Sequence, residues 1–334
     1  MALLPHGRRQ QPQMKVEGRW PLQTMVGAAD PFKTSERAMI ISRFPAKRDV
    51  TKLACTNDWA ITRMMSPTER LDWEGTSIAW GSAGSGPPIV LVHGTPFSSH
   101  VWHCIAPELG REHTLYFYDL PGYGQSEKRE GQDVSLGIQN KALAAMLAFW
   151  QLDRPNIIAH DFGGATALRA HLIDGCDYER LLLIDPVAVR PWGSPFVQHV
   201  RRHEFAFAGV PDYIQVAILK AYIAGAAAKP LSDDELQPYI APWTGSDGQA
   251  AFYRQIAQMD QRFTDEVEPL YREFRCPVAL LWGEEDRWIL PRSGEKLAAM
   301  LPDCTLTLVP GSGHLMQEDA PEAIVAAALR FFAS

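Results

Sequence analysis

The chain of 334 residues lacks several features that would each have pointed to a different class of protein. No apolar run approaches the length of a membrane-spanning helix, so a membrane protein is not expected. The five cysteines are few and scattered, without the paired spacing of a metal site or of a redox motif. No internal repeat or low-complexity tract appears. The sequence therefore predicts an ordinary globular protein, and a reducing cytoplasm is its default location.

Charge is distributed unevenly along the chain, whose formal net charge is −7. Residues 1–64 carry 11 Lys and Arg against 5 Asp and Glu, which leaves 21 against 34 for the remainder. Because the larger part is acidic, we do not expect it to bind nucleic acid. Residues 1–64 are also rich in Arg, Gln and Pro, which predicts a disordered extension or an over-extended start. The charges at the start stand in the wrong order for a secretory signal, and the five acids argue against a targeting peptide.

A sharp strand-to-helix turn is predicted around Asp161. The apolar run of residues 156–159 leads into His160-Asp161-Phe162-Gly163-Gly164, and a helical pattern continues to Ile173. A turn of small-x-acid-x-Gly type holds its central side chain above the end of a parallel sheet, and small neighbours let strand and helix approach. Amides at the start of the helix stabilise negative charge there. A plainer alternative is that Asp161 only caps the helix.

Four further predicted strands also end at chemically reactive or turn-forming residues. They are Pro88–Val92 before His93-Gly94-Thr95-Pro96, Thr114–Tyr118 before Asp119-Leu120-Pro121-Gly122, Val278–Trp282 before Gly283-Glu284-Glu285-Asp286, and Thr305–Val309 before Gly311-Ser312-Gly313-His314. The carboxyl ends of parallel strands are where open sheets build their sites. Singly, His93 fits a structural histidine, Asp286 a solvated acid and His314 a turn residue. Their joint occurrence in this order favours a catalytic set.

With these motifs the sequence resembles the α/β-hydrolase superfamily, and within it the branch of epoxide hydrolases and haloalkane dehalogenases, whose nucleophile is an aspartate. The resemblance covers about residues 66–334. It implies an α/β fold with a mostly parallel, doubly wound sheet and an inserted helical cap. We expect the core at residues 65–187 and 275–334, the cap at 188–274 and the extension at 1–64.

The resemblance also implies a role for each matching residue. Asp161 would be the nucleophile, His314 the base, and Asp286 the acid that orients it, with Asp185 at the end of another strand as the alternative acid. The amides of Thr95 and Phe162 would form the oxyanion hole. A carboxylate attacking an sp3 carbon gives an ester that water can cleave, and this chemistry needs neither metal nor organic cofactor.

The leaving group separates the two enzyme classes of this branch. Haloalkane dehalogenases hold the departing halide with a Trp after the nucleophile and an Asn after the HG pair, or with a cap Trp. Here Phe162 and Thr95 stand at the first two positions. Trp192 or Trp243 would therefore have to supply an N–H donor. Epoxide hydrolases use cap tyrosines as proton donors, and Tyr239, in the stretch 233–239, matches one of them. Tyr213 and Tyr253 are candidates for the second.

The sequence thus favours an epoxide hydrolase, with a haloalkane dehalogenase as the alternative. An ester or lactone hydrolase is less favoured because the chain has no G-x-S-x-G, and a non-catalytic binding module is disfavoured by the complete catalytic set. A small hydrophobic molecule is the expected substrate, and a homodimer is compatible with the sequence. The predicted substrate-binding residues are His93, Pro96, Trp192, Tyr213, Trp243 and Tyr253; further cap aromatics are Phe196, Phe205, Phe207 and Tyr222.

Overall fold

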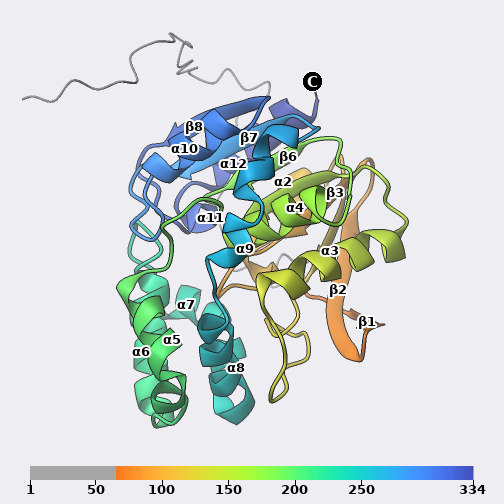
Figure 1. The fold of residues 1–334 in the computed structure, drawn as a ribbon. Helices are drawn as coiled ribbons and strands as arrows, with labels where there is room; N and C mark the ends of the chain where they lie inside the picture. The colour runs from red at the N-terminus through yellow and green to blue at the C-terminus, as the bar shows by residue number, and fades with distance from the viewer. Residues whose placement is uncertain (1–64, 334) are drawn as a thin grey trace, which may run out of the picture. The chain divides into compact units, whose positions relative to one another are not determined.

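An eight-stranded sheet forms the centre of the protein, which we describe for residues 65–333 of a computed structural model. The predicted extension therefore lies outside the described residues. The strands stand in the order β1-β2-β4-β3-β5-β6-β7-β8 (Figure 1). Their bounds are β1 Glu69–Trp73, β2 Thr76–Gly84, β3 Pro88–Val92, β4 Thr114–Tyr118, β5 Asn156–His160, β6 Leu181–Ile184, β7 Val278–Gly283 and β8 Cys304–Val309.

The sheet is antiparallel only at one edge, where β1 pairs with β2 and β2 with β4; the remaining pairs are parallel. The central parallel strands are apolar throughout because both of their faces are buried. Strand order reverses between β3 and β5, and ligands of open α/β sheets bind at such a switch point. The predicted α/β fold with a mostly parallel sheet is confirmed.

Seven helices of the core follow or connect these strands. They are η1 Ser99–Trp102, α2 Ala106–Leu109, α3 Leu136–Trp150, α4 Phe162–Leu172, α10 Arg292–Met300, α11 Met316–Asp319 and α12 Pro321–Phe332. Helix α4 packs against α3, and α12 against α2. At the start of α4, a Cβ on Gly163 would lie 2.3 Å from the Val92 carbonyl oxygen, so only glycine lets the helix approach β3 this closely.

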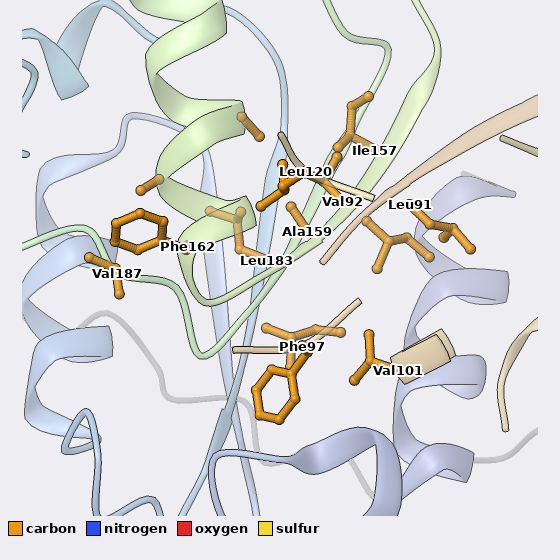
Figure 2. Packing of buried hydrophobic residues seen from close by; sticks show 14 of the residues in the cluster. Leu91, Val92, Phe97, Val101, Leu120, Ile157, Ala159, Phe162, Leu183 and Val187 are labelled. Atoms are coloured by element: carbon orange, nitrogen blue, oxygen red, sulfur yellow. The ribbon is translucent and has the colours of Figure 1, made fainter. Parts of the chain in front are cut away.

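The hydrophobic core lies directly beneath the turn between β5 and α4. Leu91, Val92, Ala159 and Leu183 are fully buried there, on three neighbouring strands (Figure 2). Burial of such side chains is worth about 1.5 to 3 kcal/mol each. The turn that carries Asp161 therefore stands directly on the buried core.

Between β6 and β7 the chain forms helices only. They are α5 Pro195–Ala208, α6 Asp212–Ala224, α7 Asp233–Ile240, η2 Ala241–Trp243, α8 Gly245–Ala257, α9 Arg262–Asp265 and η3 Glu268–Glu273. Figure 1 shows α5 to α8 grouped together beyond one end of the sheet. We refer to residues 188–274 as the cap. Within residues 65–333, no helix is long and apolar enough to cross a membrane.

Candidate active site

Asp161 occupies a strained corner between β5 and α4. Its backbone has φ 49° and ψ −116°, a conformation that costs a non-glycine residue about 1 to 3 kcal/mol and is typical of functional sites. The side chain makes no capping hydrogen bond to the helix, so the plain capping alternative is not what the geometry shows. Only glycine fits at position 94 beside this corner, because a Cβ on Gly94 would lie 2.5 Å from the Asp161 Cβ.

Three side chains from three strand-end loops meet at this corner. The Nδ1 of His314 lies 2.8 Å from Oδ2 of Asp286, and its Nε2 lies 3.3 Å from Oδ2 of Asp161, at ion-pair distance but without hydrogen-bond alignment. Oδ1 of Asp286 accepts the amides of Trp288 and Ile289 at 2.7 and 2.9 Å. Asp161, Asp286 and His314 are each at most 3% exposed. The structure thus brings the predicted catalytic set together.

The second carboxylate oxygen of Asp161 is held by the backbone. The Thr95 amide donates to Oδ1 at 2.8 Å. The Phe162 amide stands in the first turn of α4, where amides have no acceptor within their own helix. Both predicted oxyanion-hole residues therefore lie beside the nucleophile. The Thr95 hydroxyl, in turn, donates to Oε1 of Gln255 in the cap at 2.7 Å.

Electrostatics couple Asp161 to His314. Burial acts to raise the pKa of Asp161, but the close contact with His314 and its positive charge hold that pKa below its ordinary value. Burial acts to lower the pKa of His314, but the charges of Asp286 and Asp161 outweigh it and raise that pKa well above its ordinary value. In the resting protein the pair is therefore an ionised carboxylate beside an imidazolium.

Asp185, the alternative acid, lies next to the set but is not bonded to His314. Its Oδ1 accepts the Gly283 amide at 2.8 Å, and its backbone has a φ of 42°. Burial, and then the charge of Asp286, raise the pKa of Asp185 well above its ordinary value, so it is held neutral. Asp286 is the carboxylate that orients His314, which answers the question that the sequence left open.

A small cavity opens onto Asp161. Asp161 is the one ionised side chain among the described residues that line it, and the walls are mostly aromatic and aliphatic. Tyr222 stacks on Trp288 with ring centroids 4.5 Å apart, and Phe162 meets Trp192 edge to face at 6.1 Å. The lining residues are Thr95, Asp161, Phe162, Val187, Trp192, Gly193, Ser194, Val197, Tyr222, Met259, Trp288 and Ile289. Such a lining suits an uncharged, apolar ligand.

The two tryptophans predicted as halide donors already have acceptors. Trp192 lines the cavity, but its Nε1–H donates to Oγ1 of Thr264 at 2.9 Å. Trp243 is not part of the lining, and its Nε1–H donates to the Pro96 carbonyl oxygen at 2.6 Å. Neither N–H points to a leaving group in this structure.

The tyrosines singled out by sequence lie outside the lining of the cavity. The Tyr239 hydroxyl donates to Glu318, and the Tyr253 hydroxyl donates to Gln215. Tyr213 is 74% exposed on the outer side of α6. These placements do not match a proton donor that faces Asp161.

Tyr222, also on α6, is the tyrosine that lines the cavity. Burial raises its pKa, and the nearby charge of Asp161 raises it further, so its hydroxyl keeps its proton. The sequence placed Tyr222 among the cap aromatics but offered no motif that set it apart. Its helical spacing is shared by aromatics that only pack within the cap, such as Phe196 and Phe207, while Phe205 is 94% exposed.

His93, predicted as a substrate contact, is a structural residue instead. The Leu120 amide donates to its Nε2 at 2.9 Å, and its Nδ1–H donates to the Gly94 carbonyl oxygen. Burial lowers the pKa of His93 and keeps the ring neutral. Its hydrogen bond with Leu120 joins the loop after β3 to the loop after β4. Neither His93 nor Pro96 lines the cavity.

Comparison with known proteins agrees with this geometry. A family model described as "Alpha/beta hydrolase family" matches residues 89–328. The chain belongs to the alpha/beta hydrolase family. A crystal structure described as an alpha/beta hydrolase fold protein from Burkholderia ambifaria is 55% identical, with a TM-score of 0.78; the match covers 80% of this chain and 98% of that one.

More distant relatives of this alpha/beta hydrolase carry specific names. Haloalkane dehalogenase 2 of Mycobacterium tuberculosis is 27% identical over 276 residues, 75% of this chain and 89% of that protein. A structure titled as the epoxide hydrolase CorEH without ligand is 22% identical, with a TM-score of 0.65, over 79% of this chain and 98% of that one. The second likeness shows the fold alone.

Proposed function

We propose that this alpha/beta hydrolase attacks an electrophilic sp3 carbon through Asp161 and forms a covalent ester, and that its substrate is an uncharged epoxide. One observation carries the proposal: an ionised carboxylate, and not a hydroxyl, stands at the strained corner, with an amide on one oxygen and a histidine beside the other. An alkyl ether formed by a serine would be inert, whereas the ester of an aspartate can be hydrolysed.

Each oxygen of Asp161 has its own task in this scheme. Oδ2 forms the bond to the epoxide carbon while the ring C–O bond breaks, and the departing oxygen takes the proton of the Tyr222 hydroxyl. His314 then removes a proton from a water, whose oxygen attacks the ester carbonyl carbon. The negative charge of this second step develops on Oδ1, which the amides of Thr95 and Phe162 receive. Collapse breaks the bond between the carbonyl carbon and Oδ2, which leaves in the diol with the remaining hydrogen of the added water. The restored Asp161 carboxylate holds Oδ1 and the water oxygen.

Ester formation itself prepares the base. The charge of Asp161 is one of the causes that raise the pKa of His314. Once Asp161 is esterified that charge is gone, so the pKa of His314 falls. Its proton can then pass through solvent to the Tyr222 phenolate, which restores the phenol and leaves a neutral imidazole to act as the base. Only Asp286 then remains to orient the ring and stabilise the imidazolium that forms. The basicity of His314 thus changes between the two half-reactions in the direction that each one needs.

The leaving group favours the epoxide. A protonated tyrosine hydroxyl suits an oxygen that becomes an alkoxide, and Tyr222 is the acid of this kind on the cavity wall. A departing halide needs N–H donors, but those of Trp192 and Trp243 are bonded elsewhere. Haloalkane dehalogenation stays the second candidate because a relative with that name is 27% identical.

The test is a steady-state assay of the purified protein with a panel of uncharged epoxides and bromoalkanes, in which diol and bromide are measured separately. We expect diol formation and little bromide release. Strong bromide release without diol from any epoxide would establish the dehalogenase alternative. Equal inactivity towards both classes, with turnover of carboxylic esters, would reject the proposed chemistry.

A further inference from the structure

The loop that carries His314 is bonded on both sides, to the core and to the cap. On the core side, Nε2–H of His160 donates to the His314 carbonyl oxygen at 2.9 Å. On the cap side, the amide of Leu315 donates to the carbonyl oxygen of Ala226 at 2.9 Å. Ala226 begins the segment Ala226–Lys229, which follows α6. The catalytic loop is therefore not supported by its own strand β8 alone.

Asp319 joins this cap segment to the residue before His314. Its Oδ2 accepts the amides of Gly313 and Ala228, both at 2.8 Å, and its Oδ1 accepts the Lys229 amide at 2.9 Å. The ammonium group of Lys229 also donates to the Asp319 carbonyl oxygen. Asp319 is 2% exposed. Bonds from amides to a buried carboxylate are about twice as strong as those between neutral groups.

Close packing shows that the contact is a built feature. A Cβ on Gly313 would lie 2.7 Å from the Ala226 carbonyl oxygen and 2.8 Å from the Ala228 nitrogen, both backbone atoms that have no freedom to rotate away. Only glycine admits the cap segment at this position. The same segment starts a few residues after Tyr222, so one contact links the stretch that bears the phenol to the loop that bears the base.

We propose that Asp319 is a positioning residue, which latches the segment Ala226–Lys229 to the His314 loop and thereby holds the imidazole in place for ester hydrolysis. This inference rests on the proposed two-step chemistry. Attack by Asp161 needs no base, whereas the second step needs His314 aligned between water and ester. Loss of the latch therefore slows hydrolysis more than alkylation, and the alkyl-enzyme accumulates. A displacement of about 1 Å can cost about a hundredfold in rate.

The experiment compares Asp319→Ala and Asp319→Asn with the wild type. Asp319→Asn is the variant to use if the alanine variant fails to fold, because it keeps the shape and one acceptor oxygen. The matched control is Glu235→Ala, which removes the capping-box side chain at the start of α7 and so loosens the cap without touching the His314 loop. Thermal melting places all variants on one stability scale.

Two readouts are taken on each variant. The first is the mass of the intact protein after incubation with a turned-over epoxide, with His314→Gln as the positive control for an adduct. The second needs no substrate: it is the downfield proton resonance of the Nδ1–H of His314, which is donated to Asp286.

We expect the Asp319 variants to accumulate the adduct, with hydrolysis slowed about a hundredfold more than alkylation, and to weaken the downfield resonance. Glu235→Ala should do neither. If both half-reactions slow equally and the resonance is unchanged, Asp319 is only structural and the inference is overturned. If His314→Gln itself shows no adduct, the two-step chemistry is wrong, and only the resonance tests the role of Asp319. An unchanged resonance in the Asp319 variants would then show that Asp319 does not position His314.

Discussion

Core and cap contribute to the cavity in different ways. The core provides Asp161, the Thr95 amide and the hydrogen-bonded loops behind them, each fixed at the end of a strand by backbone bonds. The core also provides one part of the walls, and the cap provides the other part, which includes Trp192, Val197, Tyr222 and Met259. These are held by ring contacts and apolar packing. Under the proposed chemistry, the core would determine the reaction type, while the cap would contribute to substrate choice and assist the leaving group.

The two regions should therefore differ in how a substitution affects the rate. Removing a core group removes a step of the chemistry, whereas removing a cap group removes assistance or fit. The three predictions below follow this contrast from the largest expected effect to the smallest.

The largest effect is expected for Asp161→Asn. This variant should lose about 10⁴- to 10⁶-fold in kcat, because no other group at the corner can form the ester. A cap-wall change of conserved volume, Met259→Leu, should cost less than about tenfold. Steady-state kinetics of both variants on one epoxide measures the contrast. A similar loss in the two variants would contradict the separation of roles.

An intermediate effect is expected for Tyr222→Phe. Loss of a general acid should lower diol formation by about a hundredfold, mainly in kcat, because the hydroxyl acts on the departing oxygen. Tyr213→Phe makes the same change on the same helix, but at a side chain that is 74% exposed. Its kinetics should match those of the wild type. If Tyr222→Phe were as active as the wild type on an epoxide, the proton-donor role would fall.

The smallest effect is expected on the pKa of His314, which a pH titration of its ring resonances measures. In Asp161→Asn one of the charges that raise this pKa is removed, so the pKa should fall from its value in the wild type. A raised pKa means that charged His314 stabilises the fold below its ordinary pKa of 6.5, and that this contribution is lost as pH rises through the folded pKa. The loss should come at lower pH in the variant. An unchanged titration would show that Asp161 does not act on His314.

The core was largely predictable from sequence because its signals are local. The strands β3, β4 and β7 are apolar runs whose predicted bounds agree with the structure to within one residue. Parallel strands bring their carboxyl ends to one edge, so Asp161, Asp286 and His314 were expected to meet. The choice between Asp286 and Asp185 was not local, because it depends on where the His314 ring turns.

The cap was less predictable because its signals depend on tertiary packing. Tyr239 and Tyr222 both lie on helices, and their packing partners determine which of them faces the cavity. The Tyr239 hydroxyl donates to Glu318 in α11. Likewise, the N–H groups of Trp192 and Trp243 are bonded to acceptors 72 and 147 residues away in the chain. No pattern within a single helix reports such contacts.

The central claim is that Asp161 becomes covalently attached to the substrate, and His314→Gln tests it most directly. In this variant Asp161 can still attack, but the base that cleaves the ester is gone. Intact-protein mass spectrometry after incubation with an epoxide that the wild type turns over should show one added substrate mass, and peptide mapping should place it on Asp161. An unmodified protein under these conditions would contradict the account.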